Sequence, residues 1–167
     1  FQQHQGQASC DACPAGRYTT NTGGSNVDDC TICPAGRYLQ DEATSASRHD
    51  SVDDCTKCPA NTFIYDNAED VDYHNAAADC ADCAQGQHSD AGSRYCSTCP
   101  VGYTNFTNVT TDATSCIGCP AGRYNADPGA ADCTSCPLGF FQEEQGRSYC
   151  LPCIPGTFGD SVAMSSC

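Results

Sequence analysis

The sequence is poor in the residues that build an ordinary hydrophobic core. Leu, Ile, Val and Phe together number 19 of 167 residues, and there is one Met and no Trp. With a formal net charge of −14, such a chain would be disordered without cross-links. Seven basic residues face 21 acidic ones, which argues against nucleic acid or anionic lipid as a partner. No apolar run reaches the roughly 18 residues of a membrane-spanning helix, so we expect no membrane insertion.

Cysteine is what the sequence has in place of a core. The 17 cysteines make the density typical of secreted disulfide scaffolds. Persistent disulfides need an oxidising compartment, so we expect a secreted, extracellular or cell-surface protein. The cysteines form a series of C-x-x-C doublets and one single cysteine, Cys167; the doublets begin at Cys10, Cys30, Cys55, Cys80, Cys96, Cys116, Cys133 and Cys150. Such short, regular steps predict an array of units, each too small to fold alone.

A common string follows the second cysteine of most doublets. It reads CPAGRY at Cys13, Cys33 and Cys119, and is degraded at Cys58, Cys83, Cys99, Cys136 and Cys153. The Pro fixes φ, and the Gly supplies the positive φ of a tight turn, a place that Asn61 takes in one copy. An aromatic residue follows and can lie over the adjacent disulfide. We therefore expect small disulfide-rich tandem repeats: irregular, short β-hairpin hoops with almost no helix, stacked into an elongated rod.

These strings and doublets resemble the ephrin-receptor-like cysteine-rich repeats, and they are similar to the simplest hoop module of tumour necrosis factor receptors. The resemblance covers the whole chain and weakens around Ala84 and His88. It implies a place in receptor stalks or surface proteins. The expected units are a half repeat, 1–12, and eight full repeats: 13–32, 33–57, 58–82, 83–98, 99–118, 119–135, 136–152 and 153–167. The repeats 33–57 and 58–82 are the long ones.

Two cysteine pairings compete. In a crossed scheme two doublets interlock, as Cys10–Cys30 with Cys13–Cys33. In a hoop scheme the second cysteine of one doublet joins the first of the next. The resembling modules imply hoops, and the common string lies inside each hoop span. The hoop pairs are Cys13–Cys30, Cys33–Cys55, Cys58–Cys80, Cys83–Cys96, Cys99–Cys116, Cys119–Cys133, Cys136–Cys150 and Cys153–Cys167.

The hoop scheme leaves Cys10 without a partner in the chain. Residues 1–10 align without gaps on Phe141–Cys150, sharing Phe, two Gln, Gly and Cys at the same places. We therefore expect the sequence to begin within a repeat, with the partner of Cys10 upstream.

No catalytic or metal motif stands out. Cys10, Cys13, Cys30 and Cys33 also fit a four-thiolate zinc ribbon, but the doublets run on without grouping in fours. The four histidines (His4, His49, His74 and His88) show no common spacing, and there is no nucleophile elbow or phosphate loop. We expect neither an enzyme nor a cofactor.

Two features of the surface chemistry are left open. An acidic stretch (Asp66, Glu69, Asp70 and Asp72) offers carboxylates to Ca²⁺, but it lacks the regular spacing of a calcium loop, so a solvated loop is favoured. Asn105 and Asn108 each begin an N-x-T acceptor for N-linked glycan.

Two functions remain in competition. Uninterrupted repetition favours a structural segment of an extracellular fibre, appendage or cell-surface coat, whose partners are other copies of the chain or neighbouring repeats, together with glycans. The alternative is a ligand-binding receptor ectodomain or a stalk. A receptor should show an exposed apolar, Arg-rich patch shared by adjacent hoops.

Overall fold

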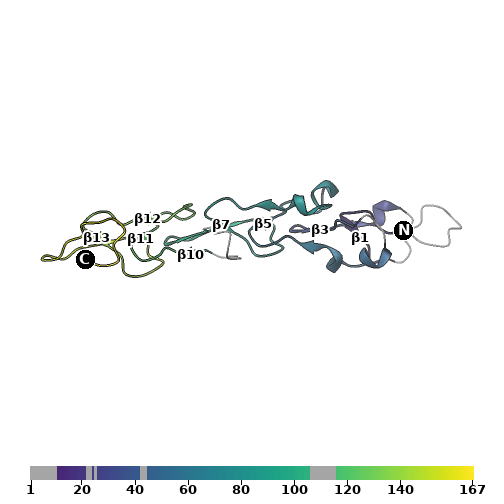
Figure 1. Cartoon of the computed structure of the whole chain (residues 1–167). Helices are drawn as coiled ribbons and strands as arrows, with labels where there is room; N and C mark the ends of the chain where they lie inside the picture. The colour runs from purple at the N-terminus through teal and green to yellow at the C-terminus, as the bar shows by residue number, and fades with distance from the viewer. Residues whose placement is uncertain (1–10, 22–23, 25, 42–44, 106–115) are drawn as a thin grey trace. The chain divides into compact units, whose positions relative to one another are not determined.

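Strands of two residues are the main regular structure of the chain. The computed structural model describes residues 11–21, 24, 26–41, 45–105 and 116–167. It contains fourteen strands and no α-helix within these ranges (Figure 1). The strands are β1 (Arg17–Tyr18), β2 (Thr31–Ile32), β3 (Arg37–Tyr38), β4 (Thr56–Lys57), β5 (Thr62–Phe63), β6 (Ala81–Asp82), β7 (Gln87–His88), β8 (Ser97–Thr98), β9 (Tyr103–Thr104), β10 (Ile117–Gly118), β11 (Arg123–Tyr124), β12 (Thr134–Ser135), β13 (Phe140–Phe141) and β14 (Leu151–Pro152).

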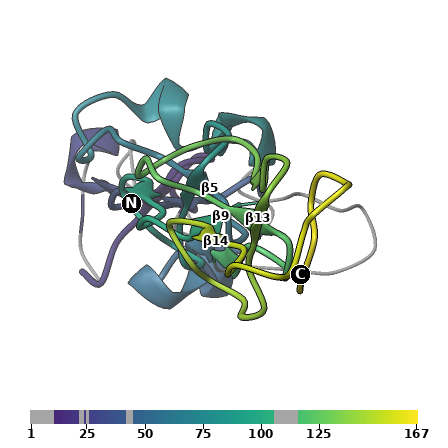
Figure 2. The ribbon, with the colours of Figure 1, turned by 90° about the vertical axis from the view of Figure 1, so that its left-hand side faces the viewer.

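Each strand pairs only with one neighbour, antiparallel, so the described chain holds seven separate two-stranded ladders. Figure 2 gives a second view of the ribbon, in which β5, β9, β13 and β14 are labelled. One strand of a ladder follows the CPxG turn, and the other is the pair of residues between the cysteines of the next doublet. In the first ladder Arg17 lies opposite Ile32 and Tyr18 opposite Thr31. The predicted fold class, disulfide-rich hairpin repeats almost without helix, is confirmed.

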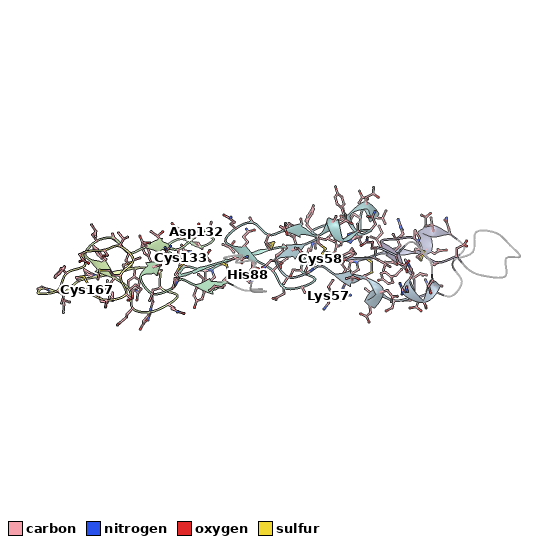
Figure 3. All side chains as sticks on the ribbon, in the orientation of Figure 1. Lys57, Cys58, His88, Asp132, Cys133 and Cys167 are labelled. Carbon is pink, nitrogen blue, oxygen red and sulfur yellow. A yellow bond between two sulfur atoms is a disulfide. The ribbon has the colours of Figure 1, made fainter. Side chains whose placement is uncertain are left out.

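The disulfides close these hairpins into hoops. The described residues hold eight bridges, and their pairs are those of the hoop scheme. Their Cα–Cα distances of 5.6 to 5.9 Å lie in the ordinary range. Figure 3 labels Cys58, Cys133 and Cys167, each from a different bridge. Cys10 lies outside the described residues.

The chain divides into two compact units. Unit 1 comprises residues 1–82 and 90–95, and unit 2 comprises residues 83–89 and 96–167. The hoop closed by Cys83–Cys96 therefore contributes its base to unit 2 and its tip, Asp90–Tyr95, to unit 1.

The core is made largely of cystine sulfur. Ten hydrophobic residues of the described ranges are buried, and eight of them are cysteines: Cys13, Cys30, Cys33, Cys55, Cys58, Cys99, Cys119 and Cys136. The other two are Leu39 and Ile64, which directly follow the aromatic of their repeats. The aromatics two residues after the turning Gly or Asn of their strings are half-buried except Phe158, which is exposed; Tyr18, for example, packs against Cys33, Cys55 and Leu39 of the following hoop. The expected miniature cores exist, with the residue after the aromatic at their centre.

The first three hoops also contain short 3-10 turns. They are η1 (Val27–Asp29), η2 (Ala46–Arg48), η3 (Val52–Asp54), η4 (Val71–Tyr73) and η5 (Ala77–Asp79). An Asp directly before a doublet ends three of these turns, and its carboxylate accepts backbone N–H groups that precede the turn. Asp79 Oδ2, for example, accepts from Asn75 and Ala76 at 3.0 and 2.7 Å. Part of the acidity of the chain is therefore used in local structure.

Candidate functional site

The CPxG glycine ties each hoop to the next through the backbone. Its N–H donates to the carbonyl of the residue that follows the aromatic of the next repeat. Examples are Gly16 N to Leu39 O at 2.8 Å and Gly122 N to Gln142 O at 2.7 Å. Its own carbonyl accepts from the second cysteine of the next doublet, as from Cys33 N to Gly16 O at 2.8 Å. Neighbouring hoops are thus joined in both directions by groups that do not depend on side chains.

The tips of the short hoops fold back on the preceding hoop. The tip residue donates its N–H to the carbonyl of the cysteine that opens the hoop before it. Four such bonds have the same length, 2.9 Å: Gly92 to Cys58, Gly129 to Cys99, Gly146 to Cys119 and Ala163 to Cys136. All four tip residues have positive φ, which turns the chain sharply enough to present the N–H.

The same tips reach one hoop further back. A Cβ added to the CPxG glycine would meet the carbonyl oxygen of the tip two hoops later, and in each case the separation would be far inside van der Waals contact. The separations are Gly36 to Gly92 O at 2.1 Å, Gly86 to Gly129 O at 2.0 Å, Gly102 to Gly146 O at 2.2 Å and Gly122 to Ala163 O at 2.0 Å. We call this arrangement, in which a tip bonds one preceding hoop and packs on the glycine of the one before, the tip interlock.

In the two long hoops, a histidine makes contacts that tip residues make in the short hoops. His49 and His74 are 1% and 0% exposed. Their carbonyls accept from Thr19 N and Leu39 N, the bonds that Arg147 and Met164 carbonyls make in short hoops. The sequence analysis was wrong to find no spacing among the histidines, since each of these two lies six residues before the first cysteine of a doublet.

The ring of His74 connects three parts of unit 1. Nδ1 lies 2.8 Å from the carbonyl of Arg37, and Nε2 lies 3.1 Å from Asp66 Oδ2. Both nitrogens therefore lie within hydrogen-bond distance of an oxygen atom. His49 repeats the first of these bonds, with Nδ1 2.9 Å from Arg17 O, while its Nε2 lies 3.9 Å from Asp41 Oδ2, beyond hydrogen-bond distance. The long hoops are therefore clamped by buried polar contacts.

The arginine of the CPAGRY string has a role that the sequence analysis did not assign. Arg17, Arg37 and Arg123 each donate from Nη1 to the carbonyl of the first cysteine of the next doublet, at 2.9, 2.9 and 3.1 Å. The bond spans the two ends of one hoop, beside its disulfide. The signal was available, because the same residue stands at the same place in all three copies of the string.

The acidic stretch proposed for Ca²⁺ is engaged in its own loop. Asp66 Oδ2 accepts from Glu69 N and Asp70 N, both at 3.0 Å, and Asp70 Oδ1 accepts from Asp72 N at 3.0 Å. Among the described residues no three His, Cys, Asp or Glu side chains converge as metal ligands. Binding of Ca²⁺ stays an expectation for experiment.

Acid should weaken the His74 clamp through Asp66. The N–H of Asp70, more than the N–H of Glu69 and the His74 ring, holds the pKa of Asp66 below its ordinary value of 3.8. A lowered folded-state pKa stabilises the fold fully above the unfolded pKa, and that stability is lost as the pH falls through the folded value. The melting temperature should therefore drop more steeply below about pH 4 in the native chain than in Asp66→Asn. Asp72→Asn, which removes a charge from the same loop, should keep the native slope; equal slopes for native chain and Asp66→Asn would contradict the assignment.

Asn105, one of the two predicted glycan acceptors, is buried. It is 6% exposed, and its Nδ2 donates to the carbonyl of Gln87. A glycan on this nitrogen would break the bond and force the side chain out of the hoop. Asn108, the other acceptor, lies outside the described residues.

We therefore expect N-linked sugar on Asn108 and not on Asn105. Chain secreted from eukaryotic cells, treated with peptide N-glycosidase in heavy-oxygen water, should carry the isotope at Asn108 alone when its peptides are weighed. Asn108→Gln should be secreted without N-glycan. Isotope at Asn105 in correctly folded protein would contradict the burial argument.

Unit 1 also carries an open aromatic groove of about 470 Å³. Tyr65 and Tyr73 on its rim are 72% and 57% exposed, while Ile64 at its base is buried. The groove is lined by Phe63, Ile64, Tyr65, Asp66, Tyr73, Ala78, Asp79 and Ala81. It belongs to one long hoop and the start of the next doublet.

Comparison with known proteins agrees with this architecture. Residues 1–30 and 126–167, less than half of the chain, match the family described as tyrosine-protein kinase ephrin type A/B receptor-like. No curated protein matches the chain. The matched segments and the tandem disulfides together identify cysteine-rich, receptor-like repeats.

The class of repeat limits the function. Repeats similar to this family and closed by many disulfides indicate an extracellular or cell-surface, receptor-type domain. Such repeats are typically non-enzymatic. In the part of the chain that the structure describes, no helix is long and apolar enough to cross a bilayer.

Proposed function

We propose that this chain is a structural segment stiffened by contacts between its own hoops, which serves as a spacer within an extracellular fibre, appendage or cell-surface protein. The observation that carries the proposal is the tip interlock. Each of the four tips described above bonds the hoop before it and packs on the glycine of the hoop before that, so three consecutive hoops restrain one another. A string of beads joined only by linkers would bend freely, whereas overlapping contacts of this kind resist bending.

The chemistry of the interlock suits a spacer. The bonds between hoops use backbone N–H and C=O groups, and the closest contacts involve glycine. Exposed side chains are therefore free to differ from repeat to repeat without loss of the contacts, as the unequal copies of the string do. The net charge of −14 keeps such surfaces soluble and mutually repelling.

Small-angle scattering tests the spacer proposal. Because each hoop is braced by its near neighbours in the sequence, we expect an extended particle whose radius of gyration is at least about twice the roughly 15 Å of a compact 167-residue domain. The value should be unchanged by moderate salt, since backbone bonds and not charges hold the hoops together. A radius of gyration near 15 Å would exclude a spacer.

One observation favours the alternative, a ligand-binding ectodomain. The aromatic groove at Tyr65 and Tyr73 leaves large apolar rings in solvent, as binding surfaces often do. Tyr65→Ser with Tyr73→Ser, introduced into the whole parent protein, separates the two roles. If the segment is a spacer, the protein that carries both substitutions keeps its function at the cell surface. If the segment binds a ligand, that function is lost while the scattering profile of the segment stays the same.

A further inference from the structure

The aromatic groove of unit 1 combines apolar side chains with two carboxylates. Six of its eight lining residues are apolar or aromatic, the other two are Asp66 and Asp79, and no described Lys or Arg lines it. Tyr65 and Tyr73 leave more than half of their surface in solvent. Arg94 donates from Nε to the Tyr65 carbonyl at 3.2 Å but is not a lining residue. The groove therefore presents aromatic rings beside negative charge.

Short turns hold these side chains in place. Tyr73 ends η4 and Asp79 ends η5. Each of the two carboxylates accepts backbone N–H groups of its own loop through Oδ2, and Asp66 Oδ2 also lies 3.1 Å from Nε2 of the buried His74. Neither Oδ1 takes a hydrogen bond from the part of the chain that the structure describes. Both carboxylates are thus fixed through one oxygen and keep the other for a ligand.

The hoop that carries the groove is strongly acidic. Between Cys58 and Cys80 the sequence has five acidic residues and no Lys or Arg. Three of the five, Glu69, Asp70 and Asp72, are exposed on the loop that joins two of the lining residues. A ligand in the groove therefore meets a negative potential from the groove and from its surroundings. Charge complementarity selects a cationic ligand.

We propose that this groove binds a basic, extended segment of a partner protein and that an Arg side chain of that segment is the anchor. Arg suits the site because its planar guanidinium stacks on aromatic rings, stays charged at physiological pH and pairs with carboxylate oxygens. Tyr65 and Tyr73 offer the rings, and Asp66 and Asp79 each offer Oδ1. The exposed acids of the neighbouring loop attract further positive charges on the segment.

The shape of the site favours a protein segment over a small cation. A pocket for a small molecule surrounds most of its ligand, whereas this groove is open and its rim tyrosines stand in solvent. The acids also continue beyond the groove, where a longer ligand reaches them. A second copy of the chain is a poor occupant, because two chains of net charge −14 repel one another.

Two peptides that differ only in charge test the inference. The first is a fluorescently labelled, amidated Gly-Arg-Gly-Arg-Gly, and in the second the neutral isostere citrulline replaces both Arg residues. Titrated with the oxidised 167-residue chain in the presence of a chelator, the Arg peptide should show a saturable rise in anisotropy. The citrulline peptide should bind at least about tenfold more weakly. Salt at about 0.5 M should also weaken the Arg peptide, because it screens the carboxylates.

Tyr95 supplies a matched control for the groove tyrosines. It is 70% exposed and belongs to unit 1, but it does not line the groove. Tyr65→Ser with Tyr73→Ser should weaken binding of the Arg peptide at least about tenfold, whereas Tyr95→Ser should leave it unchanged. Melting temperatures close to that of the native chain should show that the exposed substitutions leave the fold intact.

Equal binding of the citrulline peptide would overturn the assignment, since the groove would then accept neutral ligands. An equal loss in Tyr95→Ser would also overturn it, because it would indicate diffuse attraction to an acidic surface, and so would the absence of saturable binding. The inference does not rest on the spacer proposal. A radius of gyration near the roughly 15 Å of a compact domain would exclude the spacer and leave peptide binding unaffected. Failure of peptide binding would leave the spacer standing.

Discussion

Full reduction and alkylation of the cysteines should convert this chain into a coil. Among the residues that the structure describes, eight of the ten buried hydrophobic residues are half-cystines, and Leu39 and Ile64 are the two that remain when the bridges are opened. Two buried aliphatic side chains are worth about 3 to 6 kcal/mol, far below the conformational entropy of ordering the chain. Each bridge closes a loop with a sequence separation of 13 to 22 residues, worth at most about 3 kcal/mol in the chain-entropy model.

Circular dichroism and amide exchange check this expectation. The alkylated chain should show a coil spectrum, no cooperative melt and exchange at the rate of an unstructured peptide. Chain exposed to the alkylating reagent without reductant is the control, and it should keep its native spectrum because its described cysteines are all bridged. A cooperative melt after complete alkylation would show that hydrogen bonds and apolar contacts suffice without the bridges.

The local geometry of each hoop was predictable because it is written in consecutive residues. The CPxG string fixes a turn whose third residue must have positive φ, and Asn61, which replaces the glycine in one copy, has φ of 64°. The two residues inside a C-x-x-C doublet are the only ones that can pair with the strand after the turn. The hoop disulfides follow from that pairing, because each bridge lies beside its ladder.

The contacts between hoops could not be predicted in the same way. The carbonyl that packs on Gly36 belongs to Gly92, two hoops later, and no pattern within one repeat reveals which tip arrives there. The glycine was assigned to a turn alone, although the turn and the close approach both require it. The hydrogen bonds of the tip glycines to the cysteine carbonyls likewise depend on how whole hoops stack.

The polar core was missed for a different reason. His49 and His74 are separated by one full long repeat, and each follows an Asp by eight residues, Asp41 and Asp66. An alignment of the two long repeats with one another reveals the shared Asp–His spacing, whereas an alignment with the short repeats does not. A buried histidine is also uncommon enough that the expectation of scattered surface residues was natural. The clamp replaces, in a long hoop, the simple glycine tip of a short one.

Gly86→Ala should destabilise unit 2 severely, because this residue must both adopt a positive φ and leave space for a neighbouring carbonyl. Gly86 has φ of 77°, where an L side chain costs about 1 to 2 kcal/mol. Its Cβ would also lie 2.0 Å from the carbonyl oxygen of Gly129, a backbone atom of a residue whose own N–H is bonded to the Cys99 carbonyl. Moving that tip away adds the cost of an overpacked core, about 1 to 3 kcal/mol. We expect a total loss of about 2 to 5 kcal/mol from these two terms.

Gly156→Ala is the matched control for Gly86→Ala. Gly156 has φ of 94°, and a Cβ added to it would meet no described atom apart from chain neighbours, so only the conformational cost of the positive φ applies. Thermal unfolding of the oxidised chain should show a clearly larger drop for Gly86→Ala. Hydrogen exchange should locate the difference at the tip around Gly129 and at the Cys99 hoop, because that tip loses both of its contacts. Equal losses for the two variants would mean that turn geometry alone selects glycine in this string, and that the hoops do not interlock at their tips.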